Sequence, residues 1–104
     1  MAVAEYLALL NGVPEASSYV DNFDLAAGVA DTVTVPTGAV IAVFSANTDF
    51  LIRRGGTATL ITADVEDGTG SILNPTMRRF PPSVTSFSII SPLGGDVSIE
   101  WYKG

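Results

Sequence analysis

The residues best suited to chemistry in this sequence are three carboxylates in one short segment, Asp64-Val65-Glu66-Asp67-Gly68-Thr69-Gly70. Closely spaced acids can supply the oxygen ligands that a hard cation such as calcium prefers. The spacing does not match an EF-hand loop, because the glycine comes one position early and no acid follows at the required place. Asp and Gly also tolerate the left-handed backbone of tight turns. We therefore interpret the segment as a turn and expect no metal and no cofactor.

Two residue types are missing, cysteine and histidine. Their absence excludes disulfides, thiolate nucleophiles, Ser-His-Asp triads and the usual zinc ligand sets. Carboxylate-only catalysis survives in principle, but a chain of 104 residues has little room for both a core and a substrate cleft. The pairs Gly55-Gly56 and Gly94-Gly95 fit neither phosphate-binding glycine pattern. We predict that the protein is not an enzyme.

The chain carries little charge and its balance is acidic. Charged residues make up 15% of the sequence, whereas soluble domains average about 25%, and the formal net charge is −6. Binding to nucleic acid or to an anionic membrane requires clustered lysines and arginines, so we expect neither partner. The low charge predicts that part of the surface is buried against other copies or in a larger assembly. An ordinary β-protein covered by serine and threonine is the alternative.

Four of the five basic residues form two doublets, Arg53-Arg54 and Arg78-Arg79. Six of the eleven acids precede the first doublet, so the negative charge is concentrated in the first half of the chain. We predict that the doublets form a basic patch that a partner can bind. The alternative is local pairing with acids, for which the candidates are Asp49, Asp64, Glu66, Asp67 and Glu100.

The first thirty residues differ from the rest. Val3, Leu7 and Leu10 have helical spacing, and Asn11-Gly12 and Pro14 would end such a helix. We expect residues 1–30 to form an N-terminal arm, or a short helix plus a loop, outside a β domain that covers residues 31–104. A helix of this length is not stable alone in water. We therefore expect the arm to dock on its own domain or on a neighbouring subunit.

The apolar stretch Ala2–Leu10 also bears on targeting. It is interrupted by Glu5 and has no basic leader, so it does not read as an export signal, and it is too short to cross a bilayer. We expect synthesis as a soluble cytoplasmic product.

From Asp31 onward, short β-branched and aromatic runs alternate with Gly, Pro, Asn and Asp. This spacing predicts an all-β fold, a single antiparallel β-sandwich or jelly-roll-like barrel of about seven strands. We expect Ala39–Ser45 and Asp49–Arg54 to form a hairpin, and Thr57–Ala63 to form a further strand. The stretch Asp96–Tyr102 has a clean period of two, which predicts a closing strand.

The same alternation predicts which side chains are buried. In the closing strand Val97, Ile99 and Trp101 point inward, which leaves Tyr102 as the aromatic residue free to stack on a sugar. The strand Ala39–Ser45 is apolar on both faces. If Val40, Ala42 and Phe44 point inward, then Ala39, Ile41 and Val43 need an apolar cover outside. The predicted partner-binding residues are Val3, Leu7, Leu10, Ile41, Val43, Arg53, Arg54, Arg78 and Arg79.

Three strings of residues resemble a known family. They are Val33-Thr34-Val35-Pro36-Thr37-Gly38-Ala39, then Phe44-Ser45-Ala46-Asn47-Thr48-Asp49-Phe50, then Asp64–Pro75. In this order they resemble a VPxGA turn, an FSxxxDF segment and a DVxDGTGSxLNP loop of small structural proteins of tailed bacteriophages. The resemblance covers roughly residues 31–102 and consists of turn motifs, with no reactive residues.

The resemblance implies a virion component made in many copies, and a head decoration or cement protein is the reading that it favours. Such a protein would bind the major capsid protein on the capsid surface and associate with itself, commonly as a homotrimer. It would stabilise the assembled head by mass action and multivalency. A tail or fibre component of the virion and a carbohydrate-binding β-sandwich module are the alternatives.

Overall fold

The computed structural model describes residues 16–103, a range that contains strands and no helix. The strands form two antiparallel sheets of four strands each, with the orders β1-β8-β3-β6 and β2-β7-β4-β5. This confirms the all-β, antiparallel fold class. The strands are β1 (Val20–Leu25), β2 (Asp31–Thr34), β3 (Ala39–Ala46), β4 (Leu51–Arg53), β5 (Ile72–Leu73), β6 (Met77–Arg79), β7 (Ser86–Ile90) and β8 (Gly95–Lys103).

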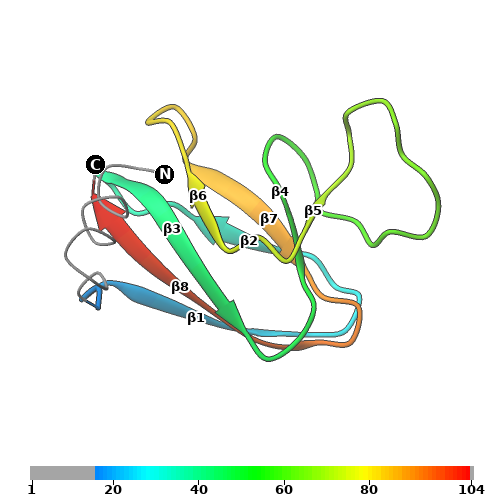
Figure 1. Cartoon of the computed structure of the whole chain (residues 1–104), viewed down its shortest axis with the longest axis horizontal. Helices are drawn as coiled ribbons and strands as arrows, with labels where there is room; N and C mark the ends of the chain where they lie inside the picture. Colours follow the sequence, from blue (N-terminus) through cyan, green and yellow to red (C-terminus); the bar gives the residue numbers. More distant parts are fainter. Residues whose placement is uncertain (1–15, 104) are drawn as a thin grey trace.

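The pairing of the strands is nested. β1 pairs with β8, β2 with β7, β3 with β6 and β4 with β5, all antiparallel. The described chain is therefore one long hairpin that bends at the connection between β4 and β5. Rolling of this hairpin brings β8 beside β3 and β7 beside β4, which completes the two sheets. In Figure 1 the start of β1 and the end of β8 lie together, away from the β4–β5 connection.

A single apolar cluster joins the inner faces of the two sheets. Period-two alternation places one side chain in two on this face. The expected inward residues of β8, Val97, Ile99 and Trp101, are all buried, which confirms the predicted parity. Aromatic rings fill the centre, where Phe80 stacks on Phe87 with ring centroids 4.9 Å apart. The cluster consists of Leu25, Val33, Ala42, Phe44, Phe50, Ile52, Phe80, Phe87, Ile89, Val97, Ile99 and Trp101.

β3 departs from the expected parity at its first residues. Its register against β8 shifts between Ala39 and Ile41, as at a β-bulge. A bulge adds one residue to one strand and so reverses the side-chain alternation on one side of it. Ala39 therefore packs against the core where Val40 was expected, while Ala42 and Phe44 point inward as predicted.

Two further local predictions are wrong. β3 and β4 do not form a hairpin, since β3 pairs with β6 and β8 in one sheet and β4 pairs with β5 and β7 in the other. The segment Thr57–Ala63 forms no strand. It crosses the outer face of the second sheet, where Ala58 packs with Leu51 and Ile90 in a small second cluster. Burial of this outer face explains why the segment is apolar without being a strand.

β1 lies within residues 1–30, the segment expected to be an arm. It pairs along its whole length with β8, and its Leu25 is buried in the main core. The sheet therefore begins before residue 31, where we expected the β domain to begin. Residues 1–15 lie outside the described residues.

Hydrogen bonds around one buried serine tie together the connections at one end of the molecule. Ser91 is fully buried, and its hydroxyl donates to the Asp49 carbonyl oxygen at 2.7 Å and accepts from the Gly94 amide at 3.1 Å. The Ser91 carbonyl accepts from the Gly28 amide at 2.8 Å. A side chain at Gly94 would meet the Leu25 carbonyl at 2.8 Å, so the close approach of these connections requires glycine there.

Replacement of Trp101 tests the core. Trp101 is 3% exposed, it packs against Phe80 and Phe87, and its indole N–H donates to Asp21 Oδ2 at 3.0 Å. We expect Trp101→Ala to lower the free energy of unfolding by roughly 3–5 kcal/mol in urea titrations. The control is Leu93→Ala at a side chain that is 83% exposed, with an expected change within about 0.5 kcal/mol. Equal effects of the two variants would contradict the placement of Trp101 in the core.

Candidate functional site

The described part of the chain places six of the nine predicted partner-binding residues. Ile41 and Val43 lie on β3, and Arg78 and Arg79 lie on the adjacent β6. In the other sheet, Arg53 is the last residue of β4 and Arg54 follows it. The β3 and β6 residues are brought together, while the two arginine doublets belong to different sheets. Val3, Leu7 and Leu10 lie outside the described residues, and nothing tests them.

The paired strands β3 and β6 present a mixed apolar and basic surface. Ile41 pairs with Arg79 and Val43 with Met77, and paired residues point to the same face of a sheet. This is the outer face, because the intervening Ala42 belongs to the core. Ile41 is only 2% exposed although it belongs to neither apolar cluster, and Val43 and Met77 are half-buried. We call Val43, Met77 and Arg79 the β3–β6 surface. Arg78 pairs with Ala42, so its side chain leaves the edge strand β6 on the opposite face.

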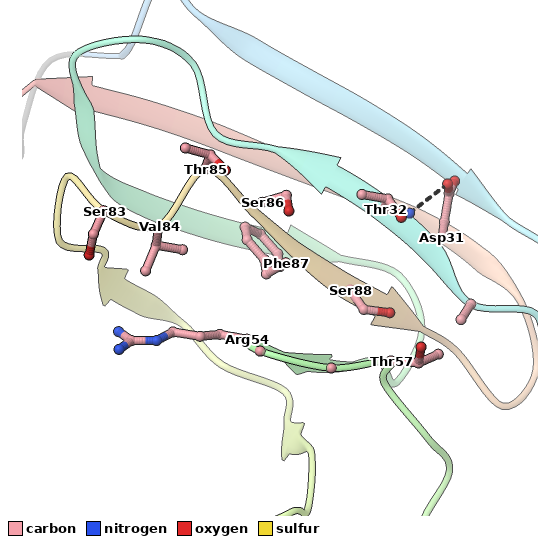
Figure 2. Close-up of a pocket in the computed structure, with 13 residues that line it drawn as sticks. Asp31, Thr32, Arg54, Thr57, Ser83, Val84, Thr85, Ser86, Phe87 and Ser88 are labelled. Carbon is pink, nitrogen blue, oxygen red and sulfur yellow. Dashed lines mark hydrogen bonds between the residues drawn. The ribbon is translucent and has the colours of Figure 1, made fainter.

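Arg54 lies at a groove on the outer face of the second sheet (Figure 2). The groove has a volume of about 670 Å³. Its floor is formed by β2 and β7, and Arg54 extends along it toward Ser83 and Val84 (Figure 2). Hydroxyl groups dominate the lining, which includes Thr32, Thr57, Ser83, Thr85, Ser86 and Ser88. We call this cavity the hydroxyl groove.

Two groups of the hydroxyl groove are already engaged. The carboxylate of Asp31 accepts a hydrogen bond from the Thr32 amide at 2.8 Å, drawn as a dashed line in Figure 2. The hydroxyl of Ser88 accepts from the Ala58 amide at 2.9 Å. That second bond fixes the segment after Gly55-Gly56 against β7 and so sets one wall of the groove.

The connection between β4 and β5, residues 54–71, projects beyond the sheets (Figure 1). We call it the β4–β5 loop. Its base is closed by a hydrogen bond from the Thr59 amide to the Ser71 hydroxyl at 3.1 Å. Beyond the base, Ile61 is 64% exposed and Val65 is 56% exposed. Sequence reasoning missed this feature because it assigned the apolar residues 57–63 to a strand. The sequence signal for a long loop was the number of residues between Gly55-Gly56 and Asn74-Pro75.

The β4–β5 loop surrounds a hollow of about 450 Å³. Apolar side chains line part of it, namely Leu60, Ile61, Ala63 and Val65. Two carboxylates, Asp64 and Glu66, line the same hollow. The arrangement can accept a side chain that has both an apolar stem and a positive charge.

The third acid of the segment, Asp67, forms a turn. Its carboxylate accepts hydrogen bonds from the Thr69 hydroxyl at 2.6 Å and the Thr69 amide at 3.1 Å. These bonds, the hydroxyl first, lower the pKa of Asp67, and the charge of Arg53 lowers it further. Within residues 16–103 no group of three or more acids is placed to hold a metal ion.

The two aromatic residues at the end of β8 both have contacts within the chain. Trp101 is in the core, and the Tyr102 hydroxyl donates to Glu100 Oε2 at 3.3 Å. Burial, followed by the charge of Glu100, raises the pKa of Tyr102. The Tyr102 ring is half-buried.

Comparison with protein-family models, with curated proteins and with solved structures finds no match. Among the described residues, no helix is long and apolar enough to cross a membrane.

Replacement of Thr69 tests the turn at Asp67. The bonds from Thr69 hold the ionised carboxylate, so they stabilise the folded loop above the unfolded-state pKa. That contribution is lost as the pH falls through the lowered folded-state pKa. We expect Thr69→Ala to raise the pKa of Asp67 toward its ordinary value in an NMR titration of the carboxyl carbon. Thr57→Ala, the control, leaves the Asp67 titration unchanged. An unchanged Asp67 pKa in the Thr69 variant would contradict the turn.

Proposed function

We propose that the protein is a non-enzymatic structural component of a tailed-bacteriophage virion, a decoration protein that binds and stabilises the assembled head. The observation that carries this proposal is the apolar surface of a domain that has little charge. Large apolar side chains are exposed on the β4–β5 loop and on the edge strand β5, at Ile61, Val65, Ile72 and Leu73. We infer that these exposed apolar side chains are covered in an assembly.

The strand order supports a finer description of the fold. We infer that the two sheets form a double-sheet jelly roll, because β1-β8-β3-β6 and β2-β7-β4-β5 are the orders that a rolled eight-stranded hairpin produces. Viral capsid and lectin domains use this architecture. It is also used for unrelated functions, so it supports the proposal without carrying it.

The turn motifs that resemble the phage family also support the proposal, since they act structurally. Asn74 accepts a hydrogen bond from the Phe50 amide at 2.9 Å, and its side-chain amide donates to Asp49 Oδ1 at 3.0 Å. Asn74 has a positive φ of 49°, a conformation in which asparagine is enriched. The FSxxxDF segment and the DVxDGTGSxLNP loop, which are separated in sequence, are thus hydrogen-bonded to each other.

In this proposal the protein is made in the host cytoplasm and is then placed on the capsid surface. Its partners are the major capsid protein and further copies of itself, and the proposed oligomer is a trimer. A protein that binds only the assembled shell shifts the equilibrium against disassembly. Many weak contacts over the shell then add through multivalency.

The test uses capsids of the phage that encodes the chain, prepared without the protein. Addition of purified protein should produce co-sedimentation with heads and raise the temperature at which they disrupt, measured by light scattering. Bovine serum albumin at equal concentration is the control. Absence of both binding and a temperature shift would refute the decoration role. Immunogold labelling of complete particles separates head from tail, and label confined to tails would support the tail or fibre alternative.

A carbohydrate-binding module is the second candidate, and the hydroxyl groove is the observation that favours it. Its hydroxyls and the Arg54 guanidinium offer the hydrogen-bond donors and acceptors that sugars need. In a glycan array, a binding module would give hits that Arg54→Gln abolishes and Arg78→Gln retains. An array without hits, alongside binding to heads, would reject this candidate in favour of the decoration role.

A further inference from the structure

The hollow of the β4–β5 loop has a chemistry that selects one kind of side chain. Leu60, Ile61 and Val65 give it apolar lining, and Asp64 and Glu66 add two carboxylates. A purely apolar group would leave the carboxylates without a partner, and a small cation would leave the apolar lining exposed. Arginine satisfies both parts, because its aliphatic stem covers apolar surface while its guanidinium forms charge-assisted bonds with carboxylates.

The chain itself carries a matching group on the β3–β6 surface. Arg79 is exposed there, on the same face as the half-buried Val43 and Met77. Apolar and basic groups on this surface complement the apolar and acidic groups of the loop. With a net charge of −6, two copies repel each other overall, and opposite charges at the point of contact offset this repulsion.

We propose that the hollow of the β4–β5 loop binds Arg79 of a second copy of the chain. The contact joins two different surfaces and is therefore heterologous, the type that closes a ring when the rotation between copies permits. It deepens the proposed function, in which copies associate on the capsid, and it names the surfaces that meet. The hollow is already present in the single chain, above the base that Thr59 and Ser71 close.

Charge exchange between two variants tests the contact, with self-association of the full chain measured by sedimentation equilibrium. One variant reverses the loop charges, Asp64→Lys with Glu66→Lys, and the other reverses the charge on the β3–β6 surface, Arg79→Glu. We expect each variant alone to self-associate at least about tenfold more weakly than the wild type, a loss of about 1.4 kcal/mol or more. An equimolar mixture should associate again, because the reversed loop of one variant then meets the reversed charge at residue 79 of the other.

Matched controls separate this contact from general effects of charge and hydrophobicity. Asp24→Lys with Asp31→Lys changes the net charge as the loop variant does, at exposed acids outside the loop, and should associate like the wild type. Ile61→Ser with Val65→Ser should weaken association, whereas Val29→Ser with Leu93→Ser, at side chains of similar or greater exposure, should not. Salt at about 1 M, where the Debye length is about 3 Å, should weaken the wild-type contact.

Several outcomes would overturn the contact: a wild-type chain that stays monomeric, a loop variant that associates like the wild type, or a mixture that fails to associate although both variants keep the wild-type urea midpoint. The capsid assay distinguishes these failures from failure of the proposed function. A monomeric chain that still raises the disruption temperature of heads refutes the contact alone. A chain that associates as described but does not bind heads refutes the decoration role alone.

Discussion

The packing of the two inner sheet faces against each other is the constraint on which the rest of this structure depends. Because side chains alternate along a strand, the choice of inner residues on each strand also fixes its outer residues. Phe87 and Ile89 are inner residues of β7, so Ser86 and Ser88 point outward into the hydroxyl groove. In β3, burial of Ala42 between the sheets leaves Val43 for the β3–β6 surface. The candidate binding surfaces are therefore consequences of the core.

At one end of the molecule, hydrogen bonds of short polar side chains, and not apolar packing, hold the connections between strands in place. Asn47 and Asp96 form a reciprocal pair, in which the Asn47 side chain donates to the Asp96 carboxylate and accepts from the Asp96 amide. With Ser91 and Asn74, this pair joins connections between strands of both sheets. The connections cross from sheet to sheet, so their backbone groups have no ladder partner, and these side chains supply the missing hydrogen bonds. The residues of the turn motifs are thus needed for the fold itself.

The sequence predicted those parts of the fold that depend on local alternation. The inward set of β8 follows directly from period two. Pairing between strands does not follow from alternation, and the expected hairpin between β3 and β4 was wrong because a short connection can also cross between sheets. The bulge in β3 and the apolar segment at Ala58 were missed for a related reason. Both depend on contacts with residues distant in sequence, Lys103 and Tyr102 in the first case and Ile90 in the second.

The candidate site was predictable to a similar extent. The residue types of Arg78 and Arg79 indicated a partner surface, and the apolar outer face of β3 indicated that it would be covered. That Arg79 lies beside the outer face of β3, and Arg78 does not, depends on the β3–β6 register, which the sequence alone does not reveal. The hollow of the β4–β5 loop was not predictable, since it arises from the closure of Thr59 on Ser71.

The nested order of pairing also bears on how the chain folds during synthesis. β8 lies between β1 and β3, so the first sheet lacks one of its two inner strands until the ribosome has released residue 103. β1 and β2 must meanwhile wait for partners far along the chain, and pairing over such separations is slow and leaves strand edges open to other chains. A nascent chain that carries β1 to β7 is therefore expected to need protection from aggregation, and release of β8 is the step that ends this vulnerability.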